Sequence, residues 1–133
     1  GAYCRYHSSL PLRLSELAIL VTAQWWQSQA EWQIHAPIAH KAGISQEISE
    51  ALRQGQTPQF NEQDEALVYQ LGIELYATRR INSNLYQEAV EQFGEPALVE
   101  LVGIYGYYAL VAMTLNVFAV DRETTEPQPF PEP

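Results

Sequence analysis

Apolar residues recur along most of this chain at the three- and four-residue spacing of amphipathic α-helices. The alternation of apolar and polar residues that marks a half-buried strand never persists over more than a few positions. Glycine, proline and helix-capping residues divide the helical pattern into separate pieces. The sequence therefore predicts an all-α fold with about six helices.

The first two predicted helices meet near a serine. Ser15 is a candidate N-cap for a helix that reaches about Trp26. The motif S-x-x-E then begins at Ser28, and in such a capping box the serine and glutamate each bind a free backbone N–H of a new helix. This second helix should run to about Ala42, with a kink at Pro37. We therefore expect the chain to break and turn near Ser28.

The remaining helices follow from similar signals. They are a helix of about ten residues capped by Ser45 and ending at Gly55, a helix capped by Asn61 that ends near Arg79 and Arg80, a helix from Asn82 or Ser83 to Gly94, and a last helix beginning at Glu95 and Pro96.

The last helix contains a stretch without charge, residues 101–120, that is long enough to cross a membrane. It also holds Thr114, Asn116 and three tyrosines, and no Lys or Arg anchors flank it in the usual way. A helix that is apolar all round also suits the centre of an all-α oligomer, so we expect a buried helix in a soluble protein. Residues 1–122 are predicted to form a single helical domain, and the proline-rich residues 123–133 an extended arm that is solvated or draped over a neighbouring subunit.

Composition narrows the function classes. The chain has 133 residues, enough for one domain, and a net charge of −9 that disfavours nucleic acid and anionic membranes as partners. Cys4 is the only cysteine, which excludes an internal disulfide, a thiolate zinc site and a Cys-x-x-Cys redox pair. A cytoplasmic location fits this cysteine usage.

Three ionisable residues in apolar surroundings are the candidate site. Glu31 and His35 are four residues apart and share one helix face. Glu16 would lie roughly 28 Å from His35 on a single straight helix, at about 1.5 Å per residue. Only a turn near Ser28 would bring all three together. Each also has a structural interpretation: Glu16 complements a helix dipole, Glu31 closes the capping box, and His35 is a core histidine bound to Glu31.

Other candidates are weaker. Trp25, Trp26 and Trp32 are most simply core or subunit interface, although they could wall an aromatic pocket. His40 is expected at the surface. A metal site is not expected, because Glu31 and His35 supply only two ligands and no second histidine shares their face.

These segments together resemble a known family. The runs LPLRLSELAILVTAQWW, AEWQIHAPIAHKAGIS and VELVGIYGYYALVAMTLNVF, in this order and spacing, are similar to the carboxymuconolactone decarboxylase-like proteins, whose superfamily includes the alkylhydroperoxidase D-type peroxidases. The resemblance covers about residues 3 to 122. It implies an alkylhydroperoxidase D-like helical fold and a homo-oligomer, a trimer or a hexamer.

The peroxidase branch of that family uses a glutamate, a Cys-x-x-Cys pair and a histidine four residues after the second cysteine. Glu16 and His35 match the glutamate and histidine, but Ser28 and Glu31 occupy the two cysteine positions. Without thiols the chain has no route for reducing a peroxide. We therefore do not expect thiol peroxidase activity.

The decarboxylase branch needs neither thiol nor, as the resemblance implies, cofactor. It implies a lyase or acid–base enzyme acting on a small lactone or organic acid, with His35 as proton donor and Glu16 or Glu31 orienting its ring. Arg13 would bind the substrate carboxylate, or it is only a surface arginine, and Trp32 would contact the substrate. The alternative is a non-catalytic oligomer that binds a small molecule or serves as a scaffold.

Overall fold

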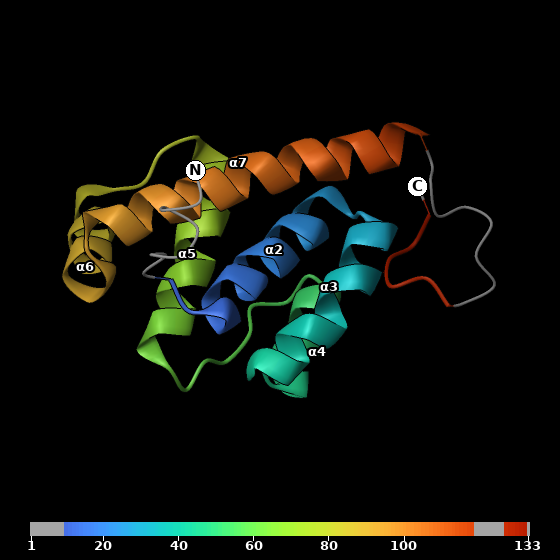
Figure 1. Ribbon diagram of the computed structural model, residues 1–133, viewed down its shortest axis with the longest axis horizontal. Helices are drawn as coiled ribbons and strands as arrows, with labels where there is room; N and C mark the ends of the chain where they lie inside the picture. The colour runs from blue at the N-terminus through green and yellow to red at the C-terminus, as the bar shows by residue number, and fades with distance from the viewer. Residues whose placement is uncertain (1–9, 119–126, 133) are drawn as a thin grey trace, which may run out of the picture.

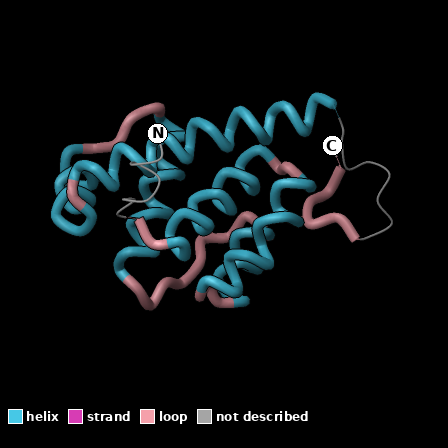
Figure 2. Tube along the Cα trace, in the orientation of Figure 1, coloured by secondary structure: helices cyan, strands magenta, loops and turns pink. Residues whose placement is uncertain are grey.

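The computed structural model describes residues 10–118 and 127–132, and within these ranges it contains six α-helices and no strand (Figures 1 and 2). The helices are α2 (Leu12–Trp26), α3 (Gln29–Ala42), α4 (Gln46–Arg53), α5 (Gln63–Thr78), α6 (Ser83–Phe93) and α7 (Glu95–Phe118). The predicted all-α fold is confirmed.

Helix α2 is the core of the molecule. It contacts α3, α4, α5 and α7, and in Figure 1 it crosses the middle of the bundle beneath the long α7. Every residue from Glu16 to Ala23 is buried, which explains why this segment is apolar on all sides rather than on one face. Glu16 is the one charged residue of this buried stretch.

The turn between α2 and α3 confirms the expected break. Gln27 adopts a left-handed conformation (φ 51°), and the N–H of Ser28 donates to the carbonyl of Ala23 at 2.9 Å. The fully buried Ser28 hydroxyl then accepts from the backbone N–H of Glu31 at 3.4 Å and caps α3. Helix α3 therefore folds back along α2, and Gly43 ends it as a positive-φ residue.

Two of the predicted helix starts are wrong. Helix α2 begins at Leu12 after Pro11, one turn before Ser15, whose hydroxyl donates within the helix to the carbonyl of Leu12 at 3.0 Å. Helix α5 begins at Gln63 rather than directly after Asn61.

The serine and asparagine caps of two other helices are confirmed. Ser45 accepts from the N–H of Ile48 at the start of α4, and Asn82 accepts from the N–H of Leu85 at the start of α6.

Helices α5 and α7 approach closely at a glycine. The buried Tyr105 of α7 donates from its hydroxyl to the carbonyl of Val68 at 2.5 Å. A Cβ atom at Gly72 would lie only 2.7 Å from the Cζ atom of Tyr105. Gly72 therefore makes room for the tyrosine ring, and Tyr105 joins the two helices.

The prediction that the last helix is buried is right for only one of its faces. Ala97, Leu98, Leu101, Tyr105, Ala109 and Ala112 face the core. The exposed apolar residues of α7 are Val99, Val102, Tyr107, Leu110, Met113, Val117 and Phe118. By length and composition alone α7 could also cross a membrane, as could the core helix of a soluble protein.

The described part of the proline-rich arm, residues 127–132, lies against α3 and α4 of its own chain. Phe130 is buried there. The sequence predicted an arm that is solvated or draped over another subunit, so the position of these residues is a correction. The rest of the arm, residues 123–126 and 133, lies outside the described residues.

Candidate active site

Glu16 and His35 meet across the α2–α3 turn. The Nδ1 atom of His35 lies 2.8 Å from the Oε1 atom of Glu16, although the two residues are 19 positions apart. Their side chains are 17% and 6% exposed, respectively, so the pair is largely shielded from water. The turn at Ser28 thus produces the approach that the sequence predicted for these two residues.

Glu31 lies in the same region but has no hydrogen-bonding role. It is 1% exposed, and neither of its carboxyl oxygens has a hydrogen-bond partner among the residues that the structure describes. The capping box is only half formed, because the N–H of Ser28 binds the carbonyl of Ala23 instead of the Glu31 carboxylate. The interpretation of Glu31 as a residue that closes the capping box is therefore wrong.

Burial has a direct consequence for Glu31. It raises the pKa of this carboxyl from its ordinary 4.5 to about 7, while the charge of the nearby His35 opposes the rise. A carboxyl group with this pKa exchanges a proton near neutral pH. Dry surroundings and a perturbed pKa beside a histidine are typical of acid–base sites, although structural groups share these features.

Two tyrosines, which the sequence did not single out, complete the surroundings. The ring of Tyr108, on α7, lies edge-on to the imidazole of His35 with 5.4 Å between ring centroids. Burial, and then the charge of Glu16, raises the pKa of Tyr108. In the sequence, Tyr108 stands out only as a polar side chain within an apolar helix. No pattern in the sequence indicates that α7 packs against α3.

Tyr76 reaches the cluster from α5. Its hydroxyl donates to the carbonyl of Tyr105 at 2.7 Å and lies 2.9 Å from the Oγ1 atom of Thr22. Burial raises the pKa of Tyr76 to about 12, and the charge of Glu31 contributes to the rise. Tyr76 therefore remains a neutral hydroxyl at physiological pH.

Arg13, the predicted carboxylate clamp, is paired with two acidic side chains of α5. Its guanidinium binds Asp64 through two hydrogen bonds of 3.2 and 2.7 Å and Glu65 through a third of 2.5 Å. These bonds lower the pKa of Asp64. Because two carboxylates of α5 occupy the fork of Arg13, it ties α2 to α5 and does not offer a free carboxylate clamp.

Trp32 and His40 have structural partners. Trp32 is buried, and its ring packs edge-on against Phe130 with 5.3 Å between centroids. His40 is half-buried rather than fully exposed, and its Nε2 atom lies 2.7 Å from the Oγ atom of Ser49. His40 therefore belongs to the α3–α4 contact.

Among the described residues no group of three or more His, Cys, Asp or Glu side chains could hold a metal ion. The described cavities include one of about 400 Å³ beside Trp25, Tyr69 and Ile73. None of the three candidate site residues, Glu16, Glu31 and His35, lines that cavity.

Comparison with known proteins identifies no relative: no protein-family model, no curated protein and no solved structure matches this chain.

Proposed function

We propose that this chain is a cofactor-free acid–base enzyme of the carboxymuconolactone decarboxylase-like kind, a lyase or related enzyme acting on a small lactone or organic acid. His35 is its proton donor. The observation that carries the proposal is the contact between Glu16 and His35, made by two helices whose turn at Ser28 folds one onto the other. The resemblance of three segments to that family supports the same conclusion.

Glu16 acts as a positioning residue in this proposal. The hydrogen bond between its Oε1 atom and the Nδ1 atom of His35 holds the imidazole ring in one orientation. It also occupies Nδ1, so that this nitrogen is not free to bind a substrate. Because Glu16 binds the Nδ1 atom, the other ring nitrogen, Nε2, is the atom that would carry the proton to a substrate. This division of roles between the two ring nitrogens is the usual one in histidine general acids.

Glu31 is a second proton-holding group beside the histidine. With a pKa of about 7 it is protonated in roughly half of the molecules at neutral pH. A neutral carboxyl group can return a proton to His35 after turnover, and the carboxylate that forms is then balanced by the new positive charge of the imidazolium. In this role Glu31 restores the imidazolium for the next reaction cycle.

The proposed reaction is proton delivery to carbon. In an unsaturated lactone acid, the bond to the carboxylate carbon breaks and carbon dioxide leaves. The electron pair of that bond delocalises into the conjugated lactone carbonyl, and His35 then protonates a carbon of the resulting anion. A related reaction without decarboxylation would move a proton between two carbons of a neutral lactone.

The paired state of Arg13 favours neutral lactones over free organic acids. Asp64 and Glu65 already bind its guanidinium, and the site contains the acidic side chains Glu16 and Glu31. An anionic substrate would have to approach these carboxylates without compensation from Arg13.

The same proposal includes assembly into a homo-oligomer. The exposed face of α7 carries Val99, Val102, Leu110, Met113 and Val117, at successive spacings of three, eight, three and four residues, as in helices that pack against one another. Such a contiguous apolar face usually marks an interface. A trimer or a hexamer built through α7 would cover this apolar face. Such an assembly would equally suit a non-catalytic scaffold.

The test is deuterium incorporation from D₂O, followed by NMR, with an unsaturated γ-lactone acid and its uncharged analogue. We expect product formation or exchange with the wild-type protein and a loss of at least about 100-fold in His35→Gln. The matched control is His40→Gln, which removes the other histidine of α3 and should retain activity. Failure of the wild-type protein to react with either compound would favour the scaffold.

A further inference from the structure

A glutamine side chain of α3 binds the backbone of the C-terminal segment in both directions. The Nε2 atom of Gln29 donates to the carbonyl of Phe130 at 2.7 Å, and the Oε1 atom of Gln29 accepts from the N–H of Phe130 at 2.9 Å. Gln29 is itself buried. The pair of bonds satisfies the N–H and C=O of one residue in the way that a neighbouring strand would.

Phe130 is the apolar anchor of this contact. Its side chain is 3% exposed and packs edge-on against Trp32, which lies one turn after Gln29 on the same helix. Aromatic pairs in this geometry attract one another beyond the effect of burial alone. One face of α3 thus supplies both the polar and the apolar contacts.

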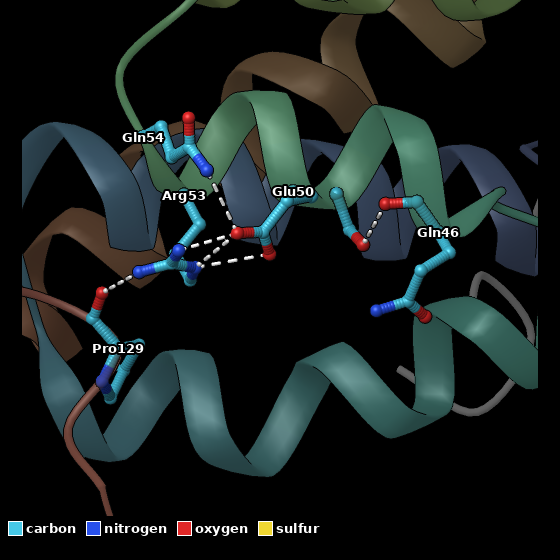
Figure 3. A network of polar contacts seen from close by, with 6 residues as sticks. Gln46, Glu50, Arg53, Gln54 and Pro129 are labelled. Carbon is cyan, nitrogen blue, oxygen red and sulfur yellow. Dashed lines mark hydrogen bonds and ion pairs between the residues drawn. The ribbon is translucent and has the colours of Figure 1, made fainter.

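Helix α4 supplies the opposite side of the binding surface. The Nη1 atom of Arg53 donates to the carbonyl of Pro129 at 2.9 Å, as Figure 3 shows. The guanidinium is held in place by the carboxylate of Glu50, which in turn accepts from Gln54 (Figure 3). Arg53 therefore reaches the segment from a fixed position.

The segment is suited to binding as a short, stiff ligand. Prolines occupy positions 127, 129, 131 and 133 around Phe130, so the unbound segment is already extended and loses little conformational freedom on binding. The polar contacts described above are made by backbone atoms of the segment, and one aromatic side chain serves as anchor. Peptide-binding domains recognise their ligands by the same combination.

We propose that α3 and α4 form a peptide-binding slot for a phenylalanine flanked by prolines, and that residues 127–132 of the same chain are its resident, displaceable occupant. Because residues 119–126 tether this occupant, its effective concentration at the slot is on the order of millimolar. A competing peptide from another protein enters only when the resident segment has withdrawn. This proposal is independent of the proposed enzymatic function.

The test uses the full chain and the synthetic peptide PQPFPEP, with PQPAPEP as the matched control peptide. Phe130→Ala removes the anchor of the resident segment and leaves the slot intact. In isothermal titration calorimetry we expect this variant to bind PQPFPEP at least about 10-fold more tightly than it binds PQPAPEP, and at least about 10-fold more tightly than the wild-type protein does. The double variant Gln29→Ala/Phe130→Ala should bind neither peptide.

Equal binding of the two peptides, or equal affinity of the wild-type and Phe130→Ala proteins for PQPFPEP, would overturn the proposal. So would a folded Phe130→Ala protein that does not bind PQPFPEP. A second measurement needs no variant: native-state hydrogen exchange should show the amide of Phe130 opening at least about 100-fold more often than the amide of Leu20 in α2. If both amides open only in global unfolding, the segment is part of the core and the proposal is wrong.

Discussion

The substitution Glu31→Gln should abolish a loss of stability that the wild-type protein shows as pH rises through the neutral range. Glu31 is buried without a hydrogen-bond partner among the described residues, and its pKa in the folded protein is about 7. Between its unfolded and folded pKa values, the folded state therefore binds more protons than the unfolded state. The free energy of unfolding must then fall as pH rises through this window.

The size of this effect follows from the pKa shift. A rise from 4.5 to about 7 corresponds to about 3 kcal/mol, at about 1.4 kcal/mol for each pKa unit. The folded state binds up to one more proton than the unfolded state between these two pKa values, so about 2 kcal/mol of this should be lost between about pH 5.5 and about pH 8.5. Glutamine has nearly the same shape and no charge, so the variant should not show this loss.

Urea denaturation at several pH values measures this difference directly. We expect Glu31→Gln to be more stable than the wild-type protein by about 3 kcal/mol at about pH 8.5, and by only about 1 kcal/mol at about pH 5.5. The matched control is Glu91→Gln, which removes an exposed carboxylate of α6 and should keep the wild-type slope. Parallel wild-type and Glu31→Gln profiles would refute the assignment of Glu31 as a dry, proton-holding group.

Four further substitutions test the fold and the assembly. Gly72→Ala should lower the free energy of unfolding by about 1–3 kcal/mol, because its new methyl group would collide with Tyr105. Gly103→Ala should raise the free energy of unfolding by up to about 1 kcal/mol, because a Cβ atom there would meet no atom of another element within 4 Å. Equal urea midpoints for the two variants would contradict this pair of predictions. Leu110→Glu should convert an oligomer to a monomer in sedimentation velocity, and an unchanged sedimentation coefficient would exclude this part of α7 from the interface. Ser28→Ala should cost about 1 kcal/mol in urea denaturation, and a neutral effect would mean that the cap does not stabilise the α2–α3 turn.

The sequence predicted the helical architecture well where local chemistry decides it. The Ser28 turn, the caps at Ser45 and Asn82 and the glycine that ends α3 each depend on residues close in the chain. Ser15 was misassigned as a cap because the helix already begins after Pro11, which has no side-chain oxygen to signal a cap. The helix takes the earlier start at Leu12, and Ser15 binds a carbonyl inside it.

The candidate site was predictable only in part. The i, i+4 spacing of Glu31 and His35 and the turn at Ser28 predicted that Glu16 would approach the histidine, and the structure brings the two together. Spacing could not show that α5 would present Asp64 to Arg13, because that pair is 51 residues apart. Nor could it place Tyr108 against His35, since that contact depends on how α7 packs over α3.

The most direct test of the central claim is the ratio of initial turnover rates of His35→Gln and His40→Gln on an unsaturated γ-lactone in D₂O, with both proteins shown to be folded. The proposed role of His35 as proton donor predicts that this ratio is about 0.01 or lower. A ratio near one would contradict the claim that the contact of Glu16 with His35 forms an acid–base site.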